Sequence, residues 1–398
     1  MAIEAAVGVG LAEDAVEATK EAITQAKLNL RKENISLAIV FGSSELPHEL
    51  ILKTISGILG PVPILGCSGA AIICNQGIFP HGLAVMLLAF PKDVYLNIAC
   101  INDISKKTAL KAGEELGDKV LHGFHDMHRN LGLLFSDGLL KEKANFIYGF
   151  QERLGQSFPV VGASAADNLR FLKTYVYFNQ QALVDAACGL LLGGRLNFGL
   201  GIKHGWKPLG KPRYVTRADG NTLYEIDGMP AAKTYEEYLA CNLSELRKEL
   251  RHISVLYPIG IHLAGEDEYL LRNVISIDDN GTLTLQGDIS EGNLIRLMIG
   301  TKESCLDATA QAVEEVKKSL HNQGSDFILV FDSVSRYILL GRQARRELEI
   351  IQRGIGQDTP LIGIYTYGEQ APLKAIDYQG RAYFHNQAIA ILGIRGMS

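Results

Sequence analysis

The stretch TPLIGIYTYGE, residues 359–369, decides how the chain is organised. Its proline, two aliphatic residues and glycine are typical of a short buried strand that begins at the proline, where a missing N–H does least harm. We expect Gly363 to allow a tight turn. The polar segment after it would then place Tyr365, Tyr367 and Glu369 on a loop. Whether the stretch is a repeated structural corner or a functional loop depends on where else it occurs.

The same pattern occurs twice more, as VPILG at 62–66 and FPVVG at 158–162. Each copy follows an apolar run that ends in phenylalanine, namely AIVF, GLLF and ILVF with Phe41, Phe135 and Phe331. Apolar residues at helical spacing lie between the two anchors. This recurrence predicts an internally duplicated unit of strand, helix, strand and strand.

A weaker fourth copy is LYPIG at 256–260, which is one residue short between proline and glycine. With it, the sequence predicts four units of about 100 residues. The strand-like runs are continuously apolar, which indicates sheets covered by helices. We therefore expect an α/β fold with two domains of mixed β-sheet, each holding two units. The boundary is placed near the Pro- and Gly-rich segment at 207–222, giving modules at 1–215 and 216–398.

The composition is ordinary for a soluble globular protein, with 47% apolar and 21% charged residues and a formal net charge of -5. No lysine- and arginine-rich run marks a nucleic-acid surface, and no apolar run is long enough to cross a bilayer. The N-terminus lacks the features of a secretory signal. Six cysteines without metal-binding spacing fit a reducing compartment. We expect a cytoplasmic protein that binds neither nucleic acid nor membrane.

The segments after the three glycines hold most candidate ligand-binding residues. They read CSGAA at 67–71, ASAADN at 163–168 and IYTYGEQ at 364–370. Small residues let successive backbone N–H groups approach an anion, and Asp167 and Glu369 suit an ammonium group.

Further residues would complete the same cleft. Arg336, just past the Phe331 strand, would hold a carboxylate through two N–H groups. Aromatic rings, hydroxyls, an imidazole and an amide would shape the rest; they belong to Tyr365, Tyr367, Trp206, His385 and Asn386. Such a cleft fits a small zwitterion, for example an amino acid. For each charged residue alone, a helix cap, a turn bond or a surface ion pair is the alternative. For Trp206 the alternative is packing between the two halves of the chain, and for His385 and Asn386 it is a hydrogen bond at the start of a strand.

Cys67 is the candidate for covalent chemistry, because a thiol in a turn that opens a helix has a lowered pKa; a small buried thiol is the alternative. Ser68 follows it, but GCSGA lacks the GxSxG spacing of a hydrolase nucleophile. GVGLAED at 8–14 lacks the third glycine of a dinucleotide site, and HDMH at 125–128 offers only a pair of imidazoles. The sequence therefore predicts neither metal nor cofactor and keeps Cys67 and Ser68 as ligand-binding candidates.

An ordered series of short motifs runs through the chain. It comprises GCSGA at 66–70, GASAADN at 162–168, HGWKPLG at 204–210, VTRADGNTLYEIDGMPA at 215–231, PIG at 258–260, YLLRNV at 269–274, LVFDSVSR at 329–336, PLIGIYTYGE at 360–369 and FHNQ at 384–387. Together these motifs resemble the FIST family, named for F-box and intracellular signal transduction proteins. The resemblance includes both its N-terminal and C-terminal modules and covers nearly the whole chain.

The resemblance implies an intracellular module that senses a small ligand, and amino acids are ligands proposed for such modules. Bacterial relatives often carry it ahead of a signalling output domain, and eukaryotic relatives pair it with an F-box. With no output segment expected here, the signal would pass through a protein partner. The oligomeric state, a homo-oligomer included, stays open. Ala70 and Ala71 depart from the family pattern GCSTAGE, which leaves the C-terminal loop with Glu369 the more family-like one.

Two other functions fit the same residues. The chain would be a thiol-dependent enzyme if Cys67 reacts selectively near neutral pH. It would be a protein-interaction adaptor if no enclosed polar pocket exists. The leading interpretation is a ligand sensor, and catalytic activity is left open.

Overall fold

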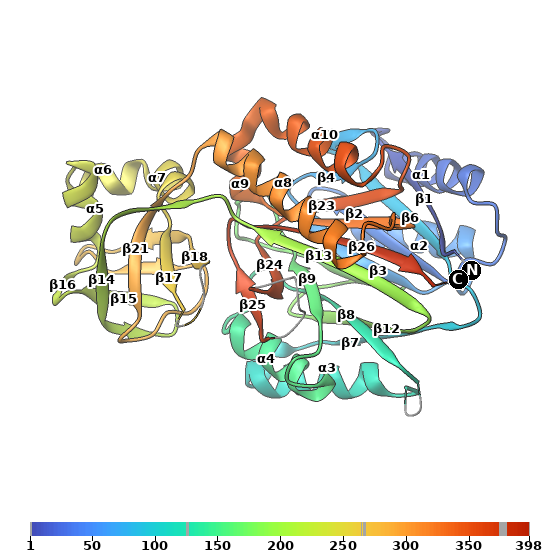
Figure 1. The fold of residues 1–398 in the computed structure, drawn as a ribbon, viewed down its shortest axis with the longest axis horizontal. Coiled ribbons are helices and arrows are strands. Elements are labelled where there is room, and N and C mark those ends of the chain that lie inside the picture. Colours follow the sequence, from blue (N-terminus) through green and yellow to red (C-terminus); the bar gives the residue numbers. More distant parts are fainter. Residues whose placement is uncertain (1, 125–126, 264, 266–267, 374–379, 398) are drawn as a thin grey trace.

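The computed structural model describes residues 2–124, 127–263, 265, 268–373 and 380–397 (Figure 1). The chain forms a large domain with mixed β-sheets and a smaller one whose sheet is antiparallel, and both carry helices. The smaller domain, on the left of Figure 1, is inserted between β13 (Leu196–Lys203) and α8 (Lys302–Ser319). The predicted α/β class with mixed sheets and two domains is confirmed, except that the sheet of the smaller domain is antiparallel.

The large domain contains three six-stranded sheets with one shared strand order, and each sheet is built on one unit of the chain. The first unit contains β1 (Glu4–Gly10), α1 (Ala15–Asn29), β2 (Leu37–Ser43), α2 (His48–Leu59), β3 (Ile64–Gly69) and β6 (Leu83–Ala89). The second contains β7 (Val94–Ile101), α3 (Ala109–Leu121), β8 (Arg129–Ser136), α4 (Lys143–Leu154), β9 (Val160–Ser164) and β12 (Ala187–Gly194). The third contains β13, α8, β22 (Phe327–Ser333), α9 (Val334–Leu340), α10 (Ala344–Ile355), β23 (Leu361–Thr366) and β26 (Ile389–Gly396). In each unit the two anchor strands are parallel neighbours, β2 with β3, β8 with β9 and β22 with β23.

The glycine of each x-Pro-aliphatic-aliphatic-Gly pattern lets two parallel strands approach. A Cβ at Gly66 would lie 1.8 Å from the carbonyl oxygen of Val40, and one at Gly363 would lie 2.5 Å from that of Val330. Such distances are far inside van der Waals contact, so only glycine fits. The expected turn at Gly363 is wrong, because β23 continues to Thr366.

The segments expected to be ligand-binding loops are crossings between sheets. Each leads into a hairpin that completes the sheet of another unit. These hairpins are β4 (Ile72–Cys74) with β5 (Gly77–Phe79), β10 (Val176–Phe178) with β11 (Gln181–Leu183), and β24 (Gly368–Pro372) with β25 (Ala382–His385). They pair with β23, β3 and β9, respectively. At the crossings, the backbone N–H groups of Ala70, Ala166 and Tyr367 donate to the carbonyls of Tyr365, Ser68 and Ser164 at 2.9, 3.0 and 3.1 Å.

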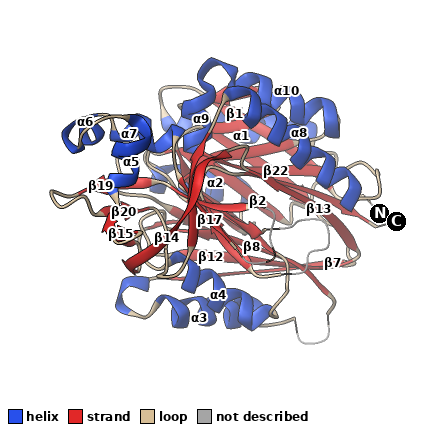
Figure 2. Cartoon of the chain, turned by 60° about the vertical axis from the view of Figure 1, so that its left-hand side comes forward, coloured by secondary structure: helices blue, strands red, loops and turns tan. Residues whose placement is uncertain are grey.

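The three anchor phenylalanines meet in the core. The ring centroids of Phe41, Phe135 and Phe331 lie 5.7–6.3 Å apart in edge-to-face pairs, an arrangement that aromatic rings favour. Helices cover the outer faces of the sheets, with α3 and α4 on one side and α8 and α10 on the other (Figure 2). Among the described residues, no helix combines the length and apolar character needed to cross a bilayer.

The small domain has a single sheet with helices packed on it. Its elements are β14 (Lys207–Asp219), β15 (Thr222–Ile226), β16 (Met229–Pro230), α5 (Ala232–Leu239), α6 (Leu243–Lys248), α7 (Leu250–Leu256), β17 (Ile259–His262), β18 (Tyr269–Arg272), β19 (Val274–Ile277), β20 (Leu283–Leu285) and β21 (Leu294–Ile299). The predicted fourth repeat at 256–260 is wrong, because β17 is antiparallel to both of its neighbours. The expectation of two units in each domain is therefore wrong as well, since three units share the large domain. The module boundary at 215/216 stays a prediction, and position 215 lies inside β14.

Candidate functional site

The ten residues predicted to bind a ligand do not surround one open cavity. All of them are buried: Cys67, Ser68, Asp167, Trp206, Arg336, Tyr365, Tyr367, Glu369, His385 and Asn386. The cavity beside His204 is lined by one of the ten, Trp206. The two other cavities discussed below are lined by none of them. The polar groups of the others are engaged mainly with the protein itself.

Arg336 is the clearest departure from the prediction. The residue, in α9, is 0% exposed, and its guanidinium forms ion pairs with Asp332 (Nε–Oδ1 2.9 Å) and Glu347. Its Nη1 donates to the carbonyl of His204 at 2.7 Å and its Nη2 to that of Cys305 at 3.0 Å. With protein oxygens on every side, this structure gives Arg336 a structural role in place of the predicted contact with a ligand's carboxylate.

Cys67 lies in the middle of the core rather than at a helix start. Its side chain is in β3 and fully buried, and burial raises the pKa of the thiol well above its usual value. A thiolate is therefore disfavoured. The neighbouring Ser68 hydroxyl donates to the carbonyl of Ala166 and accepts from the N–H of Tyr175, both at 3.0 Å. Neither side chain is placed as an accessible nucleophile.

Glu369 and His385 are also engaged inside the protein. The Glu369 carboxylate accepts from the N–H of Ala388 and the hydroxyl of Thr366, both at 3.1 Å. Burial raises its pKa well above the ordinary value, which opposes a charge that could bind an ammonium group. His385 Nε2 lies 3.0 Å from the carbonyl of Ala371, and burial lowers the pKa of this imidazole to about 4.

Asp167 organises a strained loop. Its Oδ1 accepts from the N–H of Phe171 at 2.9 Å, and its Oδ2 accepts from those of Leu172 and Lys173 at 2.7 and 2.8 Å. Residues 168, 169 and 171 have φ values of 57°, 59° and 52°. This left-handed conformation is costly for bulky side chains, so the carboxylate stabilises what we call the left-handed loop, residues 168–171.

Tyr367 also stabilises the left-handed loop. Its hydroxyl donates to Asp167, and its ring stacks on Phe171 with centroids 4.5 Å apart and planes 15° apart. Two residues from the GASAADN and PLIGIYTYGE motifs therefore cooperate, although they are 200 positions apart in the chain. Together they fix the positions of Leu169 and Phe171 in the loop.

Leu169 and Phe171 line a cavity of about 360 Å³ between the two domains, which we call the interdomain cleft. Ser335 lines it from the large domain, and α6, α7, β19 and Gln286, which follows β20, line it from the small domain. Its walls are largely aliphatic and aromatic; these residues are Leu169, Phe171, Leu250, Val255, Val274 and Ile275. An apolar concavity with a few convergent polar groups between domains is the usual form of a small-molecule site.

A polar floor closes the cleft. Asn273 Nδ2 donates to Gln286 Oε1 at 3.0 Å and to Ser335 Oγ at 3.2 Å. Gln286 in turn donates to the carbonyl of Tyr367, and the N–H of Asn273 donates to Asn386 Oδ1 at 3.3 Å. Asn273 Oδ1 is buried and has no hydrogen-bond partner within the described chain. An unpaired buried acceptor costs about 1–3 kcal/mol, so a hydrogen bond from a ligand's donor to this oxygen would be favourable.

Three of the predicted residues therefore hold the lining residues of the cleft in place without lining it themselves. Asp167 and Tyr367 hold its wall, and Asn386 holds its floor. The residues that face the cavity were missed, although Asn273 and Ser335 lie inside the quoted motifs YLLRNV and LVFDSVSR. Motif membership was the only available signal, because amide and hydroxyl side chains have no distinctive spacing.

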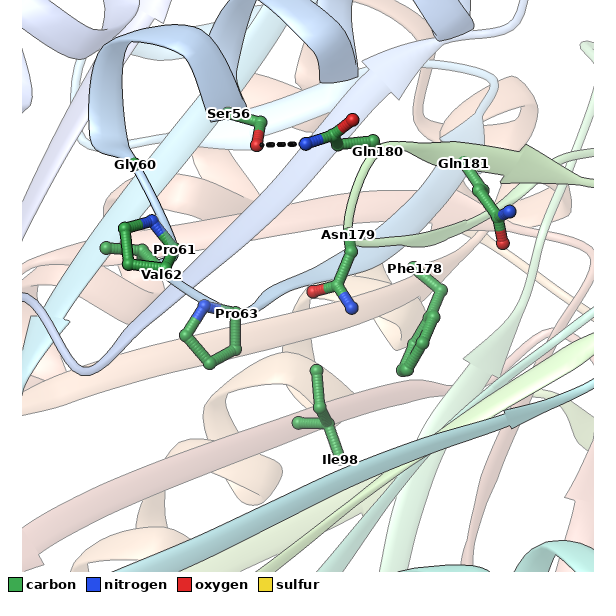
Figure 3. Close-up of a pocket in the computed structure, with 10 residues that line it drawn as sticks. All are labelled: Ser56, Gly60, Pro61, Val62, Pro63, Ile98, Phe178, Asn179, Gln180 and Gln181. Carbon is green, nitrogen blue, oxygen red and sulfur yellow. Dashed lines mark hydrogen bonds between the residues drawn. The ribbon is translucent and has the colours of Figure 1, made fainter.

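A larger hollow of about 610 Å³ lies between the end of α2 and the β10–β11 hairpin (Figure 3). Gln180 Nε2 donates to Ser56 Oγ at 2.9 Å across its rim, and Asn179 Oδ1 accepts from the N–H of Ile64. No charged side chain lines it. Within the described residues no cluster of metal ligands occurs; positions 125–126 of HDMH lie outside them. The interdomain cleft is the stronger candidate.

Comparison with known proteins identifies two family models. The FIST N domain matches residues 36–229, and the FIST C domain matches residues 231–372. An uncharacterized protein of Methanocaldococcus jannaschii is 25% identical over 72% of this chain, and the match spans 59% of that protein's length. An uncharacterized protein of Mycobacterium bovis is 22% identical over 92% of this chain and 94% of its own length.

Among solved structures, the cyanuric acid hydrolase of A. caulinodans aligns over 100% of this chain and 99% of its own. The TM-score is 0.40 and the sequence identity 8%. A likeness of this size says nothing about the reaction or the ligand of the present chain.

Proposed function

The chain belongs to the FIST family, and we propose that it is a sensory protein that binds a small ligand in the interdomain cleft. FIST domains are associated with sensory signal transduction and small-ligand binding. The proposal includes a cytoplasmic location and a protein partner that receives the signal. The observation that carries it is the cleft itself, with walls from both domains and an unpaired acceptor, Asn273 Oδ1, in its floor.

Binding between two domains supplies a way to transmit occupancy. A ligand that contacts both walls favours one interdomain angle over others, because it binds the conformations with different affinity. The chain crosses between the domains twice, and the two crossings lie side by side, with Lys207 opposite Ile299. Small rotations about this narrow connection would move the cleft walls.

Trp206 links the cleft to that connection. Its indole packs so closely on Gly300 that a Cβ there would lie 2.4 Å from the ring. Its Nε1 donates at 3.1 Å to the carbonyl of Val255, a residue that lines the cleft. Trp206 is the single tryptophan of the chain, so its fluorescence reports on this region alone.

A screen of small metabolites by thermal unfolding and Trp206 emission tests the proposal. A compound at 100 times its Kd should add about 2.7 kcal/mol to the free energy of unfolding and shift the emission of Trp206. Ile275→Phe, which narrows the cleft, should abolish both responses. Ile338→Phe is the matched control, because Ile338 on α9 is equally exposed (37% against 39%) and lies outside the cleft.

The two alternative functions make different predictions. A thiol-dependent enzyme would need an accessible Cys67, which is opposed by its burial in the core. An adaptor that binds only protein would show no response to any metabolite, and that outcome would overturn the sensor proposal. An amino acid fits the size of the cleft, but its ammonium group would meet no carboxylate among the lining residues.

A further inference from the structure

The charged side chains that line the interdomain cleft are all basic. Arg247, Lys248 and Arg251 line it, and no aspartate or glutamate does. Arg247 is already engaged, since Nη1 lies 2.6 Å from Asp279 and Nε donates to a backbone carbonyl at 3.0 Å. Lys248 and Arg251 are exposed and have no carboxylate within ion-pair distance among the residues that the structure describes. The mouth of the cleft therefore attracts anions.

The apolar wall suits a flat group. One face of the Phe171 ring stacks on Tyr367, while the residue stays partly exposed and contributes to the cleft. A planar ligand group could add a second stacked layer, an arrangement that aromatic rings favour. The aliphatic side chains of Leu250 and Ile275 add further apolar surface.

The floor of the cleft favours a ligand that carries a hydrogen-bond donor. Asn273 Oδ1 has no partner in the described chain, while the side-chain nitrogen of the same residue is engaged with Gln286 and Ser335. A ligand with an N–H or O–H group pointing down from the apolar wall would satisfy this oxygen. A site that contains such an unpaired group discriminates strongly against ligands that lack the complementary donor.

These three features define a ligand class. Building on the proposed function, we propose that the cleft binds an organic anion with a planar apolar group at Phe171, an N–H or O–H donor at Asn273, and a carboxylate at Lys248 and Arg251. A free amino acid is disfavoured, because its ammonium group would lose water without gaining a counter-charge. The class includes aromatic and N-acylated carboxylic acids.

Hippurate is the probe that carries all three groups: a benzene ring, an amide N–H and a carboxylate. Titrations followed by Trp206 emission and by calorimetry should show binding of hippurate and at least about tenfold weaker binding of the uncharged hippuramide. Phenethylamine, a cation, should not bind. The affinity for hippurate should fall as salt is raised, because exposed charges are screened. Equal affinity for hippurate and hippuramide would overturn the ligand class.

Charge reversal at the mouth gives the matched test. The double variant Lys248→Glu, Arg251→Glu should weaken hippurate binding about tenfold or more. The control, Lys318→Glu with Arg346→Glu, makes the same change in net charge on exposed positions of α8 and α10 outside the cleft, and should change binding less than twofold. All four positions are exposed, so neither variant threatens the fold. An equal loss in both variants would mean that long-range charge, not the mouth, attracts the anion, and would overturn the proposal.

The ligand class and the proposed function fail in different ways. If the metabolite screen finds neutral or cationic compounds whose binding depends on Ile275, and carboxylates do not bind, the class is wrong and the sensor stands. If no compound gives a response that depends on Ile275, the proposed function itself is wrong. Asn273→Leu should reduce hippurate binding while leaving the salt dependence intact, which separates the donor contact from the charge contact.

Discussion

Arg336→Ala is expected to lower the free energy of unfolding by about 3–5 kcal/mol, since removing one partner of a buried ion pair leaves the other charge uncompensated. Here the Glu347 carboxylate would be left in the core without a counter-charge, and Asp332 would lose the guanidinium beside it. Burial, with the charge of Glu347, already raises the pKa of Asp332 well above its usual value. Denaturant unfolding, followed by far-UV circular dichroism, measures the loss.

Arg353→Ala is the control for this variant. Arg353 forms an ion pair with Glu349 on the surface of α10, at 3.6 Å and with 73% of its side chain exposed, and its loss should change stability by less than about 0.5 kcal/mol. If Arg336→Ala unfolds with unchanged stability but no longer responds to the ligand, that result would contradict the structural role of Arg336. It would restore the sequence-based hypothesis that Arg336 holds the ligand.

Asp167→Ala should release the left-handed loop and lower the free energy of unfolding by about 2–4 kcal/mol, because three backbone donors and the Tyr367 hydroxyl lose a charged acceptor. Hydrogen exchange at the amides of Phe171, Leu172 and Lys173 should accelerate about 100-fold, the factor that corresponds to about 2.8 kcal/mol. Because Phe171 forms a wall of the cleft, ligand binding should weaken as well.

The matched control is Asp278→Ala. Asp278 also accepts two backbone N–H groups, from Asn280 at 2.9 Å and Thr282 at 2.8 Å, but on an exposed turn of the small domain. Its replacement should leave the amides at 171–173 and the ligand response unchanged. If those amides exchange at the normal rate in Asp167→Ala, other contacts hold the loop, and the account of its strain is wrong.

The repeated core could be predicted from the sequence because its determinants are local. A phenylalanine near the end of one strand and a glycine in the next mark each pair of parallel strands, and Phe41, Phe135 and Phe331 do meet. The crossings between sheets could not be predicted. A crossing residue such as Tyr367 looks like a loop residue in the sequence, because nothing in its neighbourhood encodes the distant strand β9 that its hairpin joins.

The residues predicted to bind a ligand lie one layer deeper in the structure than the lining of the proposed cleft. Charged residues inside apolar surroundings, such as Arg336 and Glu369, are conspicuous in a sequence for the same reason that they must be internally paired in a fold. Asn273 and Ser335 are inconspicuous, since their role depends on the inserted domain closing over the large one. Burial and pairing are properties of the tertiary structure, so only the coordinates separate the supporting residues from those that face the cavity.

A crystal structure with the strongest binder from the metabolite screen tests the central claim most directly. The account predicts ligand density between the Phe171 ring and the Asn273 amide, with both domains in contact with the molecule. Density confined to another hollow, such as the one at Ser56 and Gln180 (Figure 3), with the interdomain cleft empty, would contradict it.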